Sequence, residues 1–569
     1  MGPQAHKLHH RRTTVKRLWR NYEDLPKISG KSIEKTAGLN YTRHIRIFAA
    51  AGCWQNIQIL DAASQAALGG KTALKGWYKA LEDLVWLTQL GLNMLLPLVL
   101  CLAGCWWAVE RWNWPEWLFL PAVLLGLFKR TPGAVALPRT AQQVSDCLSV
   151  AHKHRVPVTV RAQASSGYGG TMPTVGGLLV DVSRMNKVIS VDEEHRTCDV
   201  EPGVVWKDLN EELSRHGLAS RICPTSGPSS TVGGMFAMGG VGIGSYRYGS
   251  ILDCVEEIDV VDPDGTMRTV KGHELSVYAF SQGTLGIITR LRLLLRKDVE
   301  LSKLAFQLAS ADQVDQVIQL LSLLHPYSIS VLSAPYLIMQ AENAKKPGQP
   351  PITSGFLMLA VFEEKPDEAT VQKITGAAHI KLLEQAVADE EWEERFYPMR
   401  LKRGGPSLLC GEYVVPRSLF GPCWKKITGR MPRDIVGLEA FADNQNQMST
   451  LVYVLDSSED FLSLFRMGKA MIPLHVARRF GGYVYASGLW FNSQSRSILG
   501  LGRWQYLKER KKALDPQNLL NTGKCCGIGL RHLPFSLLSW GIWLGTVLIA
   551  PVSAFLKARP RKLTGHEED

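Results

Sequence analysis

The chain lacks the cysteine spacing that would organise a metal centre. Its 569 residues include 11 cysteines, but no Cys-x-x-Cys pair occurs, and Cys525 and Cys526 are adjacent. The pattern therefore predicts neither an iron–sulfur centre nor a zinc ribbon. Scattered thiols of this kind are typical of a reducing compartment.

The sequence also lacks an N-terminal signal peptide, internal repeats and long low-complexity tracts. Its first long apolar run begins only at residue 84, whereas a secretory signal lies at the N-terminus. An organelle transit sequence is disfavoured because Glu23 and Asp24 interrupt the basic start of the chain early. We therefore do not interpret this start as a targeting signal.

No nucleic-acid-binding motif accompanies the net charge of +13, because the basic residues are not combined with stacking aromatic side chains. Much of the positive charge lies in two tails, residues 6–20 and 557–562. Basic runs beside apolar segments fit anionic lipid headgroups better than nucleic acid. We therefore expect a membrane, and no nucleic acid, among the partners.

Two segments are apolar enough to predict membrane helices. Residues 84–109 contain no Lys or Arg and exceed the roughly 20 residues that cross a bilayer. Tryptophans gather around their end like an interfacial belt: Trp106, Trp107, Trp112, Trp114 and Trp117. Residues 118–128 form a shorter run, either the return leg of a hairpin or a re-entrant segment. Residues 533–556 are the second full-length candidate, and a buried core helix is the alternative for both.

The most informative stretch is a loop of small residues, 161–173, with the sequence RAQASSGYGGTMP. It follows a β-branched run, 158–160, which predicts that a strand ends there. Its glycines allow positive φ and close approach to a ligand, and successive backbone N–H groups can form an anion-binding nest. Such a loop suits a pyrophosphate, and a plain turn is the alternative.

The next 130 residues predict alternating short strands and glycine-rich turns. The expected elements are strands over 178–182, 188–191 and 198–201, a helix over 204–216 closed by Gly217, a second glycine-rich stretch over 224–255, a hairpin of 257–261 and 267–270 that turns at Asp264-Gly265, and a final segment over 281–297. The stretch GGVGIG, 239–244, is not a dinucleotide fingerprint, because no helix-forming run follows it.

In the order of these motifs, residues 135–297 resemble the FAD-binding domain of the vanillyl-alcohol oxidase superfamily, which has the PCMH-type fold. The first loop is similar to the Arg-Gly-x-Gly-Thr-Gly-x-x-Gly-Gly-x-x-Pro loop of the branch that contains glycolate oxidase FAD subunits and D-lactate dehydrogenases. The resemblance implies FAD contacts from Arg161, Ala162, Gln163, Ala164, Ser165, Ser166, Gly167, Gly169 and Gly170. It implies further contacts from Pro224, Ser230, Thr231, Gly233, Gly234, Tyr248, Gly249, Asp253, Gly286 and Ile288.

Position 165 bears on how the cofactor is attached. In many members of the wider superfamily a His at this position bonds covalently to the flavin, whereas this chain has Ser165. A hydroxyl is not the nucleophile used there. The resemblance therefore implies non-covalent FAD.

The C-terminal half resembles the cap domain of D-lactate dehydrogenases through Trp392 and Arg395 in EEWEERFYPMR and Glu412 in GEYVVP. Residues 507–524, LKERKKALDPQNLLNTGK, are similar to the family's closing Lys-x-x-x-Asp-Pro-x-x-x-x-Asn-x-Gly-Lys motif. Asp515-Pro516 suits a helix stop. The resemblance implies that the turn ending at Lys524 reaches the flavin.

These observations predict an α+β protein with a PCMH-type FAD-binding domain, an α+β cap domain, and membrane helices near both ends. The expected parts are a basic region with a membrane anchor at 84–128 (1–130), the FAD-binding domain (131–297), the cap domain with the closing motif (298–525), and the C-terminal membrane segment with its tail (526–569). The positive-inside rule would place both basic tails in the cytoplasm. With a hairpin at 84–128 the N-terminus and the catalytic domain share a side, whereas a single N-terminal span would place the catalytic domain outside. FAD loading is simplest in the cytoplasm. We therefore expect the catalytic domain on the cytoplasmic face of a membrane.

One departure from the family pattern concerns metal. The metal-using 2-hydroxy-acid members carry Gly-Glu-His soon after a Gly-Gly pair. Here Gly481-Gly482 is followed by YVYASGLWF, and the nearby imidazole of His475 precedes the glycines. A metal site needs several converging ligands, so no metal is expected.

The resemblance implies hydride transfer between a substrate carbon and flavin N5, assisted by a base, with the cofactor supplying the redox chemistry. The candidate catalytic residues are Arg395, Tyr397, Glu412 and Trp490, with Arg400 and Tyr485 as further pocket candidates. An ordinary surface ion pair is the alternative for each charged residue.

Three functions remain open at this point. The first is a dehydrogenase of a 2-hydroxy acid or similar alcohol that passes electrons to a quinone or cytochrome. The second is an NADPH-dependent reductase of a lipid double bond, similar to the Δ24-sterol reductases, which the missing Glu-His and the apolar YASGLW favour. The third is a flavin-binding structural subunit of a membrane complex. The source of the electrons that reduce the flavin discriminates between them.

Overall fold

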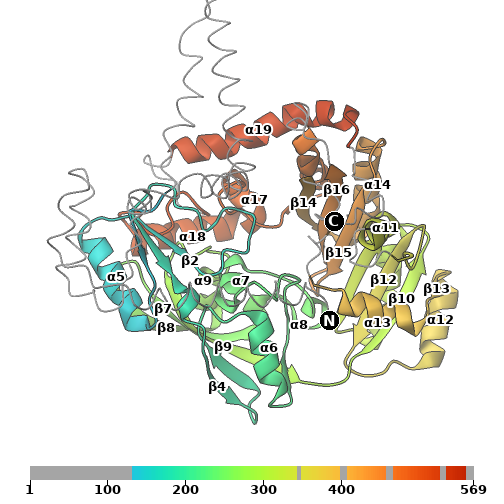
Figure 1. Ribbon diagram of the computed structural model, residues 1–569, viewed down its shortest axis with the longest axis horizontal. Coiled ribbons are helices and arrows are strands. Elements are labelled where there is room, and N and C mark those ends of the chain that lie inside the picture. The colour runs from blue at the N-terminus through green and yellow to red at the C-terminus, as the bar shows by residue number, and fades with distance from the viewer. Residues whose placement is uncertain are drawn as a thin grey trace, which may run out of the picture. The chain divides into compact units, whose positions relative to one another are not determined.

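The computed structural model describes residues 131–342, 348–396, 401, 407–456, 466–525 and 533–558 (Figure 1). The predicted anchor at 84–128, and with it the basic N-terminal region, lies outside these residues, as do Tyr397 and Arg400. The described strands form three sheets.

A three-stranded parallel sheet comes first, in the order β1-β3-β2. Its strands are β1 (Ala134–Ala136), β2 (Val158–Arg161) and β3 (Leu178–Asp181), and α5 (Ala141–Lys153) lies between β1 and β2 in the chain. The helix begins at Thr140, whose hydroxyl accepts a hydrogen bond from the Gln143 amide at 3.3 Å. The first glycine loop therefore connects two neighbouring parallel strands.

A second, antiparallel sheet has the order β4-β5-β9-β7-β8, and β6 also pairs with β9. Its strands are β4 (Val188–Asp192), β5 (Thr197–Val200), β6 (Leu218–Ser220), β7 (Val255–Val261), β8 (Met267–Lys271) and β9 (Ile287–Lys297). The helices here are α6 (Trp206–Ser214), α7 (Val232–Met238), α8 (Ser245–Tyr248) and α9 (Leu275–Tyr278). The predicted hairpin is confirmed, with Gly265 in its turn at a φ of +96°.

The cap is built on an eight-stranded antiparallel sheet in the order β13-β10-β12-β11-β15-β16-β14-β17 (Figure 1). Its strands are β10 (Ser302–Leu308), β11 (Ser328–Ser333), β12 (Phe356–Phe362), β13 (Lys381–Leu382), β14 (Ser407–Pro416), β15 (Gly437–Ala442), β16 (Gln447–Asp456) and β17 (Tyr483–Val484). The helices after β10 are α10 (Gln313–Leu321), α11 (Ala334–Glu342), α12 (Glu368–Ala378), α13 (Gln385–Glu393), α14 (Phe420–Arg430), α16 (Ile472–Arg479), α17 (Ser495–Leu499), α18 (Leu501–Leu514) and α19 (Leu533–Phe555).

The two faces of the cap sheet differ in what they carry. Side chains alternate along each strand, so Tyr413, Leu438 and Val452 share one face, which packs in a core with residues of α10, α12, α14 and α16. The opposite face carries Glu412, which pairs across β14 and β16 with Leu451, and Glu439, which pairs with the same leucine from β15. We call this the junction face, because it is the face that meets the FAD-binding domain.

The closing motif packs away from the cap. Helix α18 ends at Leu514, immediately before the predicted stop at Asp515. Leu507 and Cys525 are buried in the hydrophobic core of the FAD-binding domain, and Leu520 bridges to β2 at Val158. The predicted cap domain, 298–525, therefore includes the closing motif, although this motif packs in the core of the FAD-binding domain.

Helix α19 covers most of the predicted C-terminal membrane segment. Among the described residues, no helix is both long enough and apolar enough to cross a membrane, so the predicted span over 533–556 is not borne out. The helix contains Pro551, and its Trp543 side chain is buried on the cap, where its ring centroid lies 4.5 Å from that of His475.

Candidate functional site: two glycine loops, a buried lysine and a cap carboxylate

The first glycine loop leaves β2 and is held by the cap. Gly169 has a φ of +74°, and a Cβ there would come within 3.1 Å of the Trp490 indole nitrogen. The carbonyl of Tyr168 accepts a hydrogen bond from the Leu489 amide at 2.8 Å. At the start of the loop, Arg161 Nε donates to Asp181 on β3 at 2.8 Å. The backbone of the loop is therefore fixed at both ends, while residues 163–167 stay exposed.

The second glycine loop opens α7. The Thr231 hydroxyl accepts from the Gly234 amide at 3.2 Å, and a Cβ at Gly233 would lie 2.5 Å from Pro202. Ser230 Oγ is buried and has no hydrogen-bond partner among the described residues. A buried hydroxyl without a partner is unfavourable unless a ligand supplies one.

Two predicted cofactor residues of this loop are engaged by the protein itself. The Tyr248 hydroxyl lies 2.9 Å from both carboxylate oxygens of Glu363 on the cap side. Asp253 Oδ2 accepts hydrogen bonds from the amide and hydroxyl of Ser250, which caps the short helix that follows Gly249. Both residues shape the loop through these contacts.

The turn of the closing motif inserts beside β2. The Asn521 amide donates to the Val158 carbonyl at 2.7 Å, and its side chain accepts from the Val160 amide at 3.0 Å. Lys524 is fully buried, and its Nζ lies 3.4 Å from Asn521 Oδ1. Burial lowers the pKa of Lys524 to about 7. No carboxylate partner stands beside this ammonium group in the part of the chain that the structure describes.

These features fit FAD. The exposed loop backbone and the glycines without a Cβ leave room for a diphosphate. The buried Lys524, Ser230 Oγ and the partnerless Gln282 Oε1 are polar groups that a polar ligand would satisfy. Asn521 Nδ2 donates to the Gln282 carbonyl at 2.7 Å, and its Oδ1 lies 3.4 Å from Lys524 Nζ, so Asn521 links Lys524 to Gln282.

Glu412 lies where the cap meets the first glycine loop. The Tyr168 hydroxyl donates to Glu412 Oε2 at 2.5 Å. Burial raises the pKa of Glu412 to about 7, although the hydrogen bond from Tyr168 lowers it. A carboxyl group with a pKa near 7 populates both protonation states at neutral pH, which is what a general acid or base requires.

A second tyrosine joins the backbone of Glu412 to the second glycine loop. The Tyr485 amide, which follows β17, donates to the Glu412 carbonyl at 3.4 Å. The Tyr485 hydroxyl accepts from the Val241 amide at 3.1 Å. Burial, and next the nearby charge of Glu412, raise the pKa of Tyr485. Glu412 therefore lies at the point where the cap touches both glycine loops.

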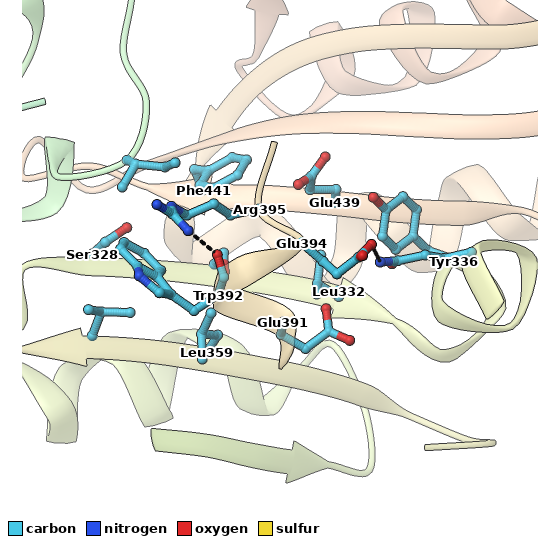
Figure 2. A pocket seen from close by; sticks show the side chains of 14 residues that line it. Ser328, Leu332, Tyr336, Leu359, Glu391, Trp392, Glu394, Arg395, Glu439 and Phe441 are labelled. Atoms are coloured by element: carbon cyan, nitrogen blue, oxygen red, sulfur yellow. Dashed lines mark hydrogen bonds between the residues drawn. The ribbon is translucent and has the colours of Figure 1, made fainter. Parts of the chain in front are cut away.

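A pocket on the junction face contains Arg395 (Figure 2). The Arg395 guanidinium lies over the rings of Trp392 and Phe396, at 4.2 and 4.4 Å from their centroids. Burial lowers its pKa from the ordinary value. The other charged residues that line the pocket are Glu391, Glu394 and Glu439. Glu439 lies two strands from Glu412, a separation of about 10 Å.

The structure thus separates the predicted catalytic residues. Glu412 and Trp490 both contact the first glycine loop, Arg395 lines the pocket on the junction face, and Tyr397 lies outside the described residues. Tyr168 was missed. Its signal in the sequence is a single large side chain in a loop of small residues, RAQASSGYGGTMP.

Groups of three or more His, Cys, Asp or Glu that could hold a metal ion do not occur within the described ranges. His475 packs against Trp543 of α19, and burial lowers the pKa of His475 to about 4. The absence of a metal from this protein stays a prediction.

Comparison with known protein families identifies the two halves. Residues 132–271 match the model of an FAD binding domain, and residues 304–525 match that of the C-terminal domain of FAD linked oxidases. The chain is an FAD-linked oxidoreductase of the PCMH-type superfamily. Its cofactor is FAD.

Curated relatives of this FAD-linked oxidoreductase match it over about 70% of its length. It is 26% identical to glycolate oxidase subunit GlcD of Bacillus subtilis (strain 168), over 70% of this chain and 89% of that protein. It is 25% identical to the mitochondrial D-lactate dehydrogenase [cytochrome] of Arabidopsis thaliana, over 69% of this chain and 73% of that protein. The structure of p-cresol methylhydroxylase with substrate bound has the same fold, with a TM-score of 0.55 and 18% identity over 70% of this chain and 89% of that one.

Proposed function

We propose that this FAD-linked oxidoreductase is a membrane-anchored dehydrogenase of a 2-hydroxy acid or similar alcohol, with Glu412 as the base. The observation that supports it best is the position of Glu412, hydrogen-bonded by Tyr168 at the meeting point of both glycine loops. The names of the relatives, glycolate oxidase and D-lactate dehydrogenase, support the substrate class.

In the proposed reaction Glu412 takes the proton of the substrate hydroxyl as the C–O bond becomes a carbonyl. FAD, when bound, supplies the acceptor for the hydride that leaves the same carbon. The ionised form of Glu412 is required, and at neutral pH its raised pKa leaves about half of the carboxyl ionised. The hydrogen bond from Tyr168 favours that ionised form.

Arg395 is the proposed anchor for a carboxylate of the substrate. Its guanidinium is partly buried in a pocket of the junction face, and a buried cation favours an anionic partner. The pocket is not next to Glu412, because Glu439 on its wall already lies about 10 Å from Glu412. The proposal therefore favours a substrate longer than lactate, or one whose second polar group occupies the pocket.

The cofactor contacts follow the same proposal. The two glycine loops would hold the diphosphate of FAD. Ser230 Oγ and Gln282 Oε1 would form hydrogen bonds with the cofactor, and the charge of Lys524 would lie beside it. Attachment is non-covalent, since Ser165 stands where a histidine would be needed. Electrons leave for a membrane acceptor, a quinone or a cytochrome, on the cytoplasmic face to which the predicted anchor at 84–128 attaches the enzyme.

The alternative of a lipid double-bond reductase loses one of its two supports, the apolar segment YASGLW. Leu489 and Trp490, read from the sequence as an apolar pocket, pack against the backbone of Tyr168 and Gly169 instead. Their apolar character is explained by the contact between cap and loop, without a lipid substrate.

An anaerobic absorbance titration of the detergent-purified full chain tests the proposal. D-lactate, glycolate and 2-hydroxyglutarate are added in turn, followed by NADPH. Bleaching of the visible flavin band by a hydroxy acid is expected. Bleaching by NADPH alone would move the assignment to the reductase, and a flavin that nothing reduces would favour a structural role.

A further inference from the structure

Helix α19 carries an apolar stripe that nothing in the described part of the chain covers. Its members are large side chains between 43% and 71% exposed: Trp540, Leu544, Val547, Val552 and Phe555. Residues 540, 544, 547 and 555 follow helical spacing, so they lie along one side of the helix. Single exposed apolar residues are ordinary, but an aligned row of this size marks an interaction surface.

The side of the helix next to the stripe is fixed to the cap. Trp543 is buried against His475, and the Arg478 guanidinium lies 5.0 Å from its ring centroid. Arg433 donates to the Phe555 carbonyl at 3.0 Å, and the Ala558 amide donates to Asp434 at 2.8 Å. The helix is thus held along its length, and the cap holds the apolar stripe outward.

Charge around the stripe indicates which partner it takes. No Asp or Glu occurs between residues 533 and 562, and basic residues flank the helix at both ends: Arg531, Lys557, Arg559, Arg561 and Lys562. Apolar side chains beside clustered Lys and Arg are the pattern of a helix that lies in the plane of an anionic membrane surface. Trp540 also suits the interfacial layer, where tryptophan is enriched.

We propose that α19 lies flat in the interface of an anionic bilayer, with its apolar stripe in the acyl boundary and its flanking basic residues on lipid headgroups. This surface rests on the membrane attachment in the proposed function but adds a second contact, made by the cap itself. It would hold the cap at a fixed height and orientation on the membrane. A reduced flavin would thereby face an acceptor in the same bilayer with each turnover.

The test places a photo-crosslinking amino acid, p-benzoylphenylalanine, at Leu544 in the full chain reconstituted in vesicles of phosphatidylglycerol and phosphatidylcholine. Irradiation and mass spectrometry then identify what the probe contacts. The expected product is a lipid adduct. The same probe at Val547 repeats the measurement if the first variant does not retain its flavin absorbance, and the probe at Ile189, which is exposed on the FAD-binding domain, is the matched control and should give none.

Three outcomes would overturn the inference: adducts to residues 84–128 of the same chain, adducts to a second copy, or no adduct at all from either α19 position. Vesicles of phosphatidylcholine alone should lower the lipid yield, and an unchanged yield would contradict the part assigned to the basic residues. None of these readouts uses the redox reaction, so failure of the titration above leaves the result intact. If the chain stays bound to vesicles but gives no lipid adduct at α19, the predicted anchor is retained and the contact proposed for α19 is rejected.

Discussion

Lys524 on the FAD-binding side and Glu412 on the cap side are both buried, and burial moves their pKa values toward 7 from opposite directions. Lys524 comes down from about 10.5, and Glu412 comes up from 4.5. The cation has no carboxylate partner among the described residues and is placed by a tight turn, whereas the carboxyl group is held by a tyrosine from the other domain. The first is suited to hold an anionic ligand, and the second to exchange a proton.

The two groups also give opposite pH dependence of stability. The folded state of the cofactor-free protein holds fewer protons at Lys524 than the unfolded chain between pH 7 and about 10.5, so the free energy of unfolding rises with pH there. The folded state holds more protons at Glu412 between pH 4.5 and about 7, so the free energy of unfolding falls with rising pH in that window.

The largest expected effect is on chemistry at the cap side. The Glu412→Gln variant should reduce its flavin with the substrate about 10²- to 10⁴-fold more slowly, because a general base contributes that much. Its FAD content should not change, since Glu412 is not among the cofactor contacts. Stopped-flow absorbance under anaerobic conditions measures the rate. Glu368→Gln, exposed at the start of α12 on the cap, is the control, and an equal loss there would show that the effect is not specific to Glu412.

The next effect sharpens the comparison from the FAD side. Lys524→Met should weaken FAD binding roughly 10- to 100-fold, because a hydrogen bond to a charged group contributes about 1.5–3 kcal/mol. The cofactor-free variant should be more stable than the natural protein at neutral pH and should lose the rise in stability between pH 7 and 10. Flavin fluorescence titration and urea denaturation measure the two quantities. Unchanged FAD affinity would remove Lys524 from the cofactor site.

A smaller effect tests the contact that joins the two sides. Gly488 has a φ of +49°, and a Cβ there would lie 2.1 Å from the Tyr168 carbonyl oxygen. Gly488→Ala should therefore destabilise the protein by roughly 1–3 kcal/mol. Gly481→Ala, also at positive φ but with open space around it, should cost only about 1 kcal/mol. Thermal release of FAD reports both, and equal losses would mean that the cap does not press on the loop.

The smallest expected effect is a shift in a pH profile. Tyr168→Phe removes the hydrogen bond that favours the carboxylate, so the pKa of Glu412 should rise by about one unit. At neutral pH the flavin reduction rate should then fall only several-fold. Tyr485→Phe keeps the Tyr168 bond and should shift the midpoint less. A downward shift in the Tyr168 variant would reverse the assigned role of this hydrogen bond.

The sequence predicted more of the FAD-binding side than of the cap side, and the reason is physical. Local backbone constraints determine the glycine loops, the hairpin at Asp264-Gly265 and the helix end at Asp515. These constraints select glycine, proline and capping residues that lie close together in the sequence, so the features can be recognised from it. The Tyr168–Glu412 and Tyr485–Val241 contacts each join residues 244 positions apart. Such contacts depend on strand register in the cap, and no periodicity in a single sequence encodes it. Glu412 was identified by resemblance, but its partner was not.

The membrane predictions divide in the same way. Apolar composition alone led to a predicted span over 533–556. The packing of Trp543 on the cap, which the composition does not show, indicates a helix attached to the cap.

The central claim, that Glu412 at the junction is the catalytic base, is tested most directly by the pH dependence of anaerobic flavin reduction. The natural protein is mixed with whichever hydroxy acid bleaches its flavin, between pH 5 and 9. The rate constant should rise with pH to a plateau with a midpoint near 7, and the Glu412→Gln variant should show no such inflection. The same inflection in the variant would contradict the claim and assign the base to another group.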